Sequence, residues 1–189
     1  WAHDEGLATH LDGARLMNAV VATGIPAADW AKHFDSVSIC FSKGLGAPVG
    51  SALAGTRDFI REARRHRKAL GGGMRQGGII AAAALFALEN HVDRLAEDHA
   101  HARRLAEVVA SCEGISLWPP RVETNIVVFE IDPELGTAAE VAARLRQEGL
   151  LVLAVAPTRI RAVTHLDVDA AQISRACEIL RQAAGRLVA

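Results

Sequence analysis

A short β-branched run that leads into a lysine and a glycine-rich turn constrains this sequence most strongly. The run 37–41 is apolar and too short for a typical helix, which is typical of a buried strand in an open α/β sheet. Lys43 follows after one residue, so its amine should lie at the carboxyl end of the strand, where such sheets bind ligands. A lysine in that position suits a Schiff-base nucleophile. Taken by itself, the pattern is also typical of a surface lysine that opens a loop.

A second apolar run is expected to place further charged side chains at the same edge of the sheet. Residues 7–11 predict another short buried strand, which ends in Asp12 and leads to Arg15. Residues 14–23 have the apolar spacing of a helix, and a second short helix should precede the strand at 37–41. Asp12 alone could be a capping or turn aspartate. Two consecutive strands that each end in a charged residue favour a functional site instead.

The glycine-rich turn after Lys43 does not predict a nucleotide site. Its sequence G-L-G-A-P-V-G has the spacing G-x-G-x-x-x-G, contains Pro48, and leads into the strand-like S-A-L-A-G rather than a helix. A G-x-x-x-x-G-K-[ST] loop is absent from the sequence as well. We therefore exclude the dinucleotide fingerprint and the P-loop as interpretations.

Composition narrows the class of protein further. Half of the 189 residues are hydrophobic, 23% are charged, and the net charge is −1, so nothing favours a nucleic acid or an anionic membrane as partner. The longest apolar run, 79–88, is too short to span a bilayer. Cys40, Cys112 and Cys177 are odd in number and show no C-x-x-C spacing, which is typical of reduced thiols in a cytoplasmic protein.

The rest of the chain predicts two parts, residues 1–112 and 113–189. Helices are expected at 56–68, 78–90 and 92–110, and residues 112–120 should form a connection. We then expect five elements in the order strand, helix, strand, strand, helix, at 124–131, 137–148, 151–156, 159–164 and 169–187. This order predicts a compact α+β domain with its helices on one face of a small sheet.

Several basic side chains are candidates for binding an anion. Four cations share one face of the helix at 56–68, where a solvated surface is the simpler interpretation: Arg61, Arg64, Arg65 and Lys68. Arg75 follows three consecutive glycines, whose backbone can approach a neighbouring group closely, and is a candidate phosphate or carboxylate ligand. No metal site is predicted, because His99 and His101 are two residues apart and point to different sides of their helix.

A lysine at one strand end and an aspartate with an arginine at another are the groups that a pyridoxal 5′-phosphate (PLP) enzyme requires. The lysine binds the aldehyde of the cofactor covalently. The aspartate keeps the pyridine nitrogen protonated, so that the ring accepts electrons released at the α-carbon of the substrate. An arginine supplies a bidentate grip on the carboxylate of an amino acid.

Four segments resemble the low-specificity L-threonine aldolases, which are fold-type I PLP enzymes related to the aminotransferases. In chain order they are H-L-D-G-A-R-L-x-N-A (10–19), S-I-C-F-S-K-G-L-G-A-P-V-G-S (38–51), R-K-x-x-G-G-G-M-R-Q (67–76) and R-x-V-T-H-L-D-V (161–168). The resemblance implies an α/β fold, namely the carboxyl-terminal part of an aminotransferase-like large domain (1–112, with an interdomain helix) and a small α+β domain (113–189).

The resemblance also implies roles for individual residues. Lys43 and Asp12 would be catalytic and bind PLP, and Arg15 and Arg161 would grip the substrate carboxylate. Arg15 would also lie at the cofactor. Lys68 and Arg75, both in the motif at 67–76, would lie near the cofactor phosphate or the site entrance. His10 and His165 receive no catalytic role. A cytoplasmic homo-oligomer, a dimer or tetramer with a shared site, is implied.

One departure from the family affects the expected activity. In the family, the turn that holds the cofactor phosphate and the histidine that stacks on the ring lie far upstream of the aspartate motif, whereas eleven residues precede Asp12 here. We therefore expect a carboxyl-terminal portion that is incomplete as an enzyme by itself. The expected reaction is cleavage of threonine to glycine and acetaldehyde. Another fold-type I PLP lyase, a transaminase, and a non-catalytic fragment that binds no cofactor remain alternatives.

Overall fold

A computed structural model describes residues 1–187, and its contacts divide the chain into two compact units. The first unit is Trp1–Leu95 and the second begins at Ala96. Each unit has its own sheet with helices, so the predicted α/β class is confirmed. The units divide earlier than the predicted 112/113 domain boundary, because the helix that follows Leu95 packs in the core of the second unit. That boundary stays a prediction.

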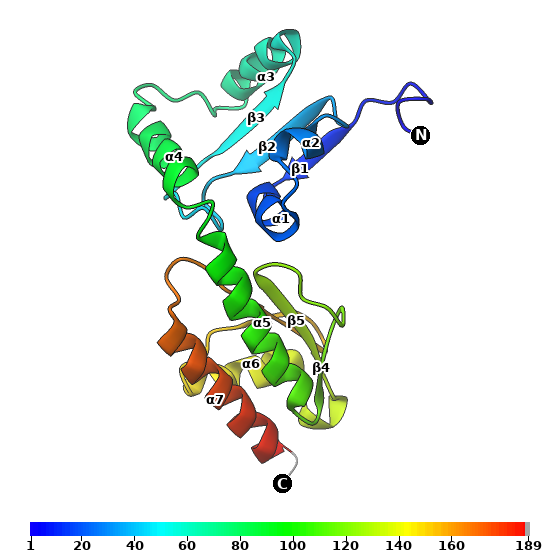
Figure 1. The fold of residues 1–189 in the computed structure, drawn as a ribbon, viewed down its shortest axis with the longest axis vertical. Coiled ribbons are helices and arrows are strands. Elements are labelled where there is room, and N and C mark those ends of the chain that lie inside the picture. The colour runs from blue at the N-terminus through cyan, green and yellow to red at the C-terminus, as the bar shows by residue number, and fades with distance from the viewer. Residues whose placement is uncertain (188–189) are drawn as a thin grey trace. The chain divides into compact units, whose positions relative to one another are not determined.

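The first unit contains most of the candidate site. Its elements are β1 (His10–Gly13), α1 (Leu16–Thr23), α2 (Ala27–Ala31), β2 (Ser36–Cys40), β3 (Ser51–Gly55), α3 (Arg57–Ala69) and α4 (Gly78–Asn90) (Figure 1). The strand order is β1-β2-β3, with β1 and β2 parallel and β3 antiparallel to β2. Both predicted strands next to the charged residues are therefore present and paired.

β1 begins later than predicted because Thr9 has other hydrogen-bond partners. The Asp35 carboxylate accepts hydrogen bonds from the Thr9 backbone N–H, at 2.7 Å, and from its hydroxyl, at 3.1 Å. These bonds lower the pKa of the Asp35 carboxyl below its ordinary value. Pairing of β1 with β2 then brings the backbones so close that a Cβ on Gly13 would lie 2.6 Å from the Ser38 carbonyl oxygen. β1 therefore begins at His10, and Asp12 lies within the strand.

The second unit is a sheet covered by helices. Its elements are α5 (Leu95–Ser111), β4 (Ile115–Leu117), β5 (Ile126–Ile131), the 3-10 helix η1 (Pro133–Leu135), α6 (Ala138–Gln147), β6 (Leu153–Ala156), β7 (Arg159–Val163) and α7 (Ala170–Leu187) (Figure 1). The strands are antiparallel in the order β4-β5-β7-β6. β4 lies within the segment predicted to be a connection, so that prediction is wrong there.

Alternation along β5 separates the two faces of this sheet. Val127, Phe129 and Ile131 are buried, whereas the residues between them are only partly buried. The buried side chains pack in one core with residues of α5, α6 and α7, and Figure 1 shows α5 and α7 beside the sheet. The prediction of helices on one face is therefore confirmed. The opposite face carries Arg159 and Arg161 of β7.

The first unit has a much smaller core. Its buried apolar cluster consists of Leu45, Ala47, Ala87 and Leu95. α4 is apolar almost throughout, yet several of its large side chains are exposed, including Ile79 at 85% and Phe86 at 57%. Every residue of β3 is exposed as well. The second unit therefore buries its apolar residues more completely than the first.

Hydrophobic helix length and the cysteines are two further features of the described residues. Within residues 1–187, no helix is long and apolar enough to cross a membrane. Cys40, Cys112 and Cys177 form no disulfide in this part of the chain, and Cys177 is buried. Burial raises the pKa of the Cys177 thiol, as expected for an inert thiol in a core.

Candidate active site

Lys43 lies in a tight turn directly after β2, and its side chain is exposed. Gly46 N–H donates to the Lys43 carbonyl oxygen at 2.9 Å, and Ala47 N–H donates to the Phe41 carbonyl oxygen at 2.9 Å. These bonds close the backbone around Lys43, whose side chain remains exposed. The predicted position at the carboxyl end of a strand is therefore present in the structure.

The backbone of this turn is anchored by residues that the sequence did not single out. His91, at the end of α4, donates from Nδ1 to the Leu45 carbonyl oxygen at 2.6 Å. A Cβ on the buried Gly44 would lie 3.0 Å from both Asn18 Oδ1 and Leu95 Cδ2, so this position favours glycine. Since Leu45 is itself buried, the turn is held on its inner side while Lys43 remains accessible.

Asp12 lies near the end of β1, opposite Ser38 of β2 in the parallel register. Its carboxylate is exposed and accepts a hydrogen bond from Ala14 N–H at 3.2 Å. Because parallel strands present their carboxyl ends at one edge, Asp12 in the last part of β1 and Lys43 after the end of β2 lie toward the same edge of the sheet. The sequence prediction that these two residues share an edge agrees with this register.

Arg15 lies at the amino-terminal end of α1 and is partly buried. It therefore follows Asp12 at the same edge of the sheet. Lys68 belongs to the last turn of α3, and Arg75 lies in the loop before α4; both are exposed. Among residues 1–187, no hydrogen bond or ion pair joins Lys68 or Arg75 to Lys43 or Asp12. Their predicted position near a cofactor phosphate remains a prediction.

The three glycines before Arg75, residues 71–73, bring the backbone close to neighbouring side chains. A Cβ on Gly73 would lie 2.7 Å from Lys68 Cδ, and a Cβ on Gly72 would lie 3.1 Å from Arg67 Cγ. Gly71 has a φ of 82°, in the region that favours glycine. The close approach expected from the sequence is therefore present, and its partners are side chains of α3.

Arg161 lies on β7 in the second unit, on the face of the sheet opposite the helices. Its side chain is exposed, and no carboxylate in the described part of the chain forms an ion pair with it. Such a guanidinium is available for a carboxylate ligand. Its assignment as a substrate-binding residue stays a prediction.

The chemistry of the first-unit residues fits PLP. The cofactor needs a primary amine for its aldehyde and a carboxylate for its ring nitrogen. Lys43 and Asp12 supply these groups at one sheet edge; both are exposed, and neither forms an ion pair with another side chain among the described residues. An amine and a carboxylate that are not already paired remain free to bind a ligand.

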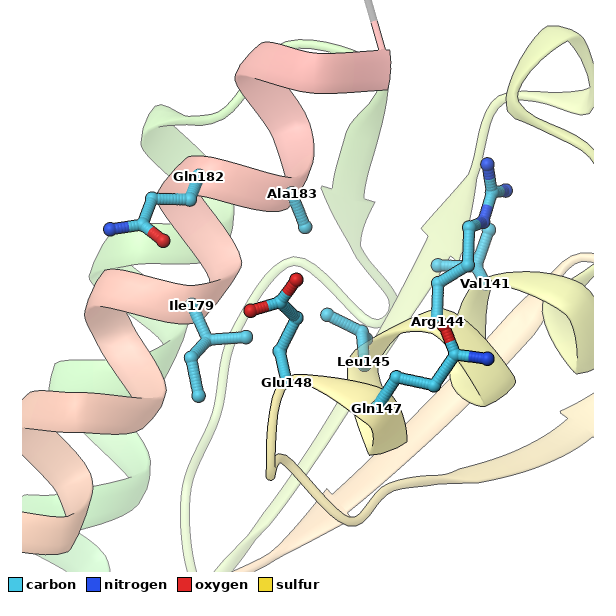
Figure 2. Close-up of a pocket in the computed structure, with 8 residues that line it drawn as sticks. All are labelled: Val141, Arg144, Leu145, Gln147, Glu148, Ile179, Gln182 and Ala183. Atoms are coloured by element: carbon cyan, nitrogen blue, oxygen red, sulfur yellow. The ribbon is translucent and has the colours of Figure 1, made fainter.

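The pocket shown in Figure 2 lies elsewhere. It has a volume of about 330 Å³, lies between α6 and α7, and is lined by Val141, Arg144, Leu145, Gln147, Glu148, Ile179, Gln182 and Ala183. None of these is a candidate catalytic residue. Arg144 donates to the Leu135 carbonyl oxygen, which directs its guanidinium to the backbone. Residues 1–187 contain no group of three His, Cys, Asp or Glu side chains that could hold a metal ion.

Comparison with known proteins identifies similar enzymes. Residues 1–132 match the beta-eliminating lyase family. Low-specificity L-threonine aldolase 1 of Arabidopsis thaliana is 40% identical over 183 residues, which are 96% of this chain and 51% of the relative. The low specificity L-threonine aldolase of Escherichia coli O157:H7 is 44% identical over 174 residues, 92% of this chain and 50% of the relative. The chain spans about half the length of the curated relatives it matches.

Solved structures show the same fold. Leishmania major threonine aldolase has a TM-score of 0.79 and 25% identity, with 100% of this chain and 54% of the neighbour covered. Ornithine delta-aminotransferase of Plasmodium falciparum has a TM-score of 0.68 at 14% identity, with 98% of this chain and 49% of the neighbour covered. The second similarity extends the shared fold to the aminotransferases, as the predicted fold class requires.

Proposed function

The chain belongs to the beta-eliminating lyase family. From this premise we propose that it is part of an enzyme that catalyses PLP-dependent retro-aldol cleavage. The substrates would be L-threonine, L-allo-threonine and related β-hydroxy-α-amino acids, and the products glycine and an aldehyde. The observation that carries the proposal is the pair Lys43 and Asp12: Asp12 lies near the carboxyl end of β1, and Lys43 follows the neighbouring parallel strand β2. The names of the similar enzymes from A. thaliana and E. coli support the substrate class.

Lys43 would provide the amine that bonds covalently to the cofactor and is displaced by the amino group of the substrate. PLP supplies an electron sink for the pair released when the Cα–Cβ bond breaks. Asp12 would hold a negative charge at the ring nitrogen and keep that nitrogen protonated. The fixed turn around Lys43 supports this role, because an anchored backbone limits the positions that the amine can reach.

Two arginines would bind the substrate carboxylate. Arg15 and Arg161 each present a planar guanidinium, which can donate two parallel hydrogen bonds to a carboxylate. This grip would orient the α-carbon so that the bond to be broken stands next to the electron sink. Lys68 and Arg75 would contribute positive charge near the cofactor phosphate or at the entrance to the site, where their exposure suits an anion.

We further propose that the enzyme is a cytoplasmic homo-oligomer, a dimer or a tetramer with a shared site. Unpaired cysteines suit a reducing compartment. The exposed apolar side chains of α4 support an oligomer, since large apolar surfaces are usually covered. Because the chain spans about half the length of its relatives, we also propose that the 189 residues alone do not sustain turnover.

A product assay tests the proposed function. The complete, PLP-loaded protein is incubated with L-threonine, and glycine and acetaldehyde are measured. Equal amounts of both products are expected. A transaminase would instead form a keto acid and require an amino acceptor. Absence of both a cofactor absorbance and products would favour the non-catalytic alternative and contradict the proposal.

A further inference from the structure

Two arginines stand on the outer face of the second-unit sheet, but they differ in their partners. Arg159 and Arg161 are two residues apart on β7, so their side chains lie on the same face, and the buried Ile160 between them points into the core. Arg159 forms an ion pair from Nε to Glu130 Oε1 at 2.9 Å. Arg161 has no such pair among residues 1–187.

Glu130 could reach either arginine. In the register of β5 and β7, Glu130 lies opposite Arg159, and Val128 lies opposite Arg161. Glu130 is therefore the diagonal neighbour of Arg161, and diagonal neighbours on an antiparallel pair are about 7–8 Å apart, within reach of long side chains. A carboxylate so close to Arg161 would compete with any carboxylate ligand, because it is tethered to the same sheet.

Two contacts hold Arg159 in the position that engages Glu130. The ion pair with Glu130 is one, and both side chains are only about one third exposed, at 33% and 38%. The second is Trp118, whose ring lies 3.8 Å from the Arg159 guanidinium carbon. The backbone N–H of Trp118 donates to the Val128 carbonyl oxygen at 2.9 Å, which fixes the Trp118 backbone beside β5. The attraction between the guanidinium and the ring adds a second restraint on the Arg159 side chain, which is already paired with Glu130.

We propose that Arg159 is a positioning residue that keeps Glu130 away from Arg161 and so leaves the Arg161 guanidinium available for the carboxylate of the amino-acid substrate. The inference rests on the proposed function, in which Arg161 grips that carboxylate. Arg159 itself does not touch the substrate. Arg159 acts by determining which arginine Glu130 pairs with. Replacing Arg159 should therefore change substrate binding and not the chemical step.

The test compares four variants of the complete, PLP-loaded enzyme. Arg159→Met removes the charge and keeps an unbranched side chain against Trp118, so Glu130 should turn to Arg161. The KM for L-threonine should rise about two- to fivefold, the range that an exposed ion pair supplies, with kcat unchanged. Glu130→Gln added to Arg159→Met should return KM to the value of Glu130→Gln alone. Arg159→Lys keeps the charge and should remain near the wild-type KM.

A structural readout makes the test independent of activity. In a crystal structure of Arg159→Met, a Glu130 carboxylate oxygen should lie about 3 Å from the Arg161 guanidinium. Arg159→Gln removes the same charge and serves if the methionine variant does not fold. An unchanged KM in the charge-removing variant, a raised KM that Glu130→Gln does not restore, or a Glu130 that stays away from Arg161 would overturn the inference.

Failure of the proposed function would be recognised separately. If the wild type forms no glycine from threonine, or if Arg161→Lys leaves KM unchanged, the assignment of Arg161 to the substrate is wrong. The position of Glu130 in the Arg159→Met crystal structure would still decide whether Arg159 controls its partner.

Discussion

The imidazole Nδ1 of His91 donates a 2.6 Å hydrogen bond to the carbonyl oxygen of Leu45, which lies two residues after the candidate catalytic lysine. The bond links the end of α4 to the turn that follows β2. Since Leu45 is almost fully buried, few alternative donors can reach its carbonyl group. The position of Lys43 therefore depends on a bond between two residues, Leu45 and His91, that are 46 positions apart in the sequence.

Replacing His91 should destabilise this turn. His91→Leu leaves the Leu45 carbonyl oxygen without its donor, which should lower the free energy of unfolding by about 1–3 kcal/mol. His91→Asn is the matched control, because its amide nitrogen can donate from a similar position. Denaturant titration of both variants measures the difference. Equal stability of the leucine and wild-type proteins would show that the bond contributes nothing.

Asp12→Asn should retain the covalent attachment of PLP but lose most of the turnover. The amide carries no charge to hold the ring nitrogen protonated, and a loss of about one to three pKa units there corresponds to a 10- to 1000-fold loss in rate. Absorbance of the bound cofactor and the rate of glycine formation are measured together. Near-normal turnover with cofactor bound would remove Asp12 from its role.

Arg161→Lys should raise the KM for threonine about tenfold or more and leave cofactor binding intact. Lysine keeps the charge but lacks the planar fork, so at least one charge-assisted hydrogen bond of about 1.5 kcal/mol is lost. Arg175→Lys, at an exposed arginine on α7 that pairs with Glu178, is the matched control. Steady-state kinetics that give the same KM for both variants would count against Arg161 as the carboxylate ligand.

The second unit should lose stability in mild acid because of His99. Burial of this side chain lowers its pKa from the ordinary value of 6.5, and the nearby Asp98 opposes the effect only partly. The unfolded chain therefore binds a proton more readily, so stability is full above about pH 6.5 and falls as the pH decreases below it. His99→Gln should flatten this dependence. Urea midpoints at pH 7.5 and 5.5 test it, and identical pH dependence in both proteins would refute it.

Local patterns were sufficient to place Lys43 and Asp12. Each follows a short apolar run, and an open α/β sheet presents such positions at one edge, so periodicity and strand length predicted where the two groups lie. The structure confirms both strands, with β1 displaced toward Asp12 because Thr9 bonds to Asp35. The strands next to Lys43 and Asp12 were therefore predictable, because their pattern is contained in a few consecutive residues.

Contacts between distant segments were not predictable in this way. β4 has only the residues Ile115–Leu117, and its pairing with Phe129–Ile131 of β5 stabilises it, so the local sequence resembles a connection. The His91 bond to Leu45 and the ion pair of Arg159 with Glu130 likewise join separate elements. A lone histidine or arginine carries no sequence signal for its partner, although the break in the helix near His91 was visible.

The central claim is that Lys43 is the residue that binds PLP covalently. The most direct measurement is reduction of the PLP-loaded protein with borohydride, followed by peptide mapping by mass spectrometry. The account predicts a pyridoxyl group on the peptide that contains Lys43 and none in Lys43→Ala. A pyridoxyl group on Lys32 or Lys68, or an adduct that survives in Lys43→Ala, would contradict it.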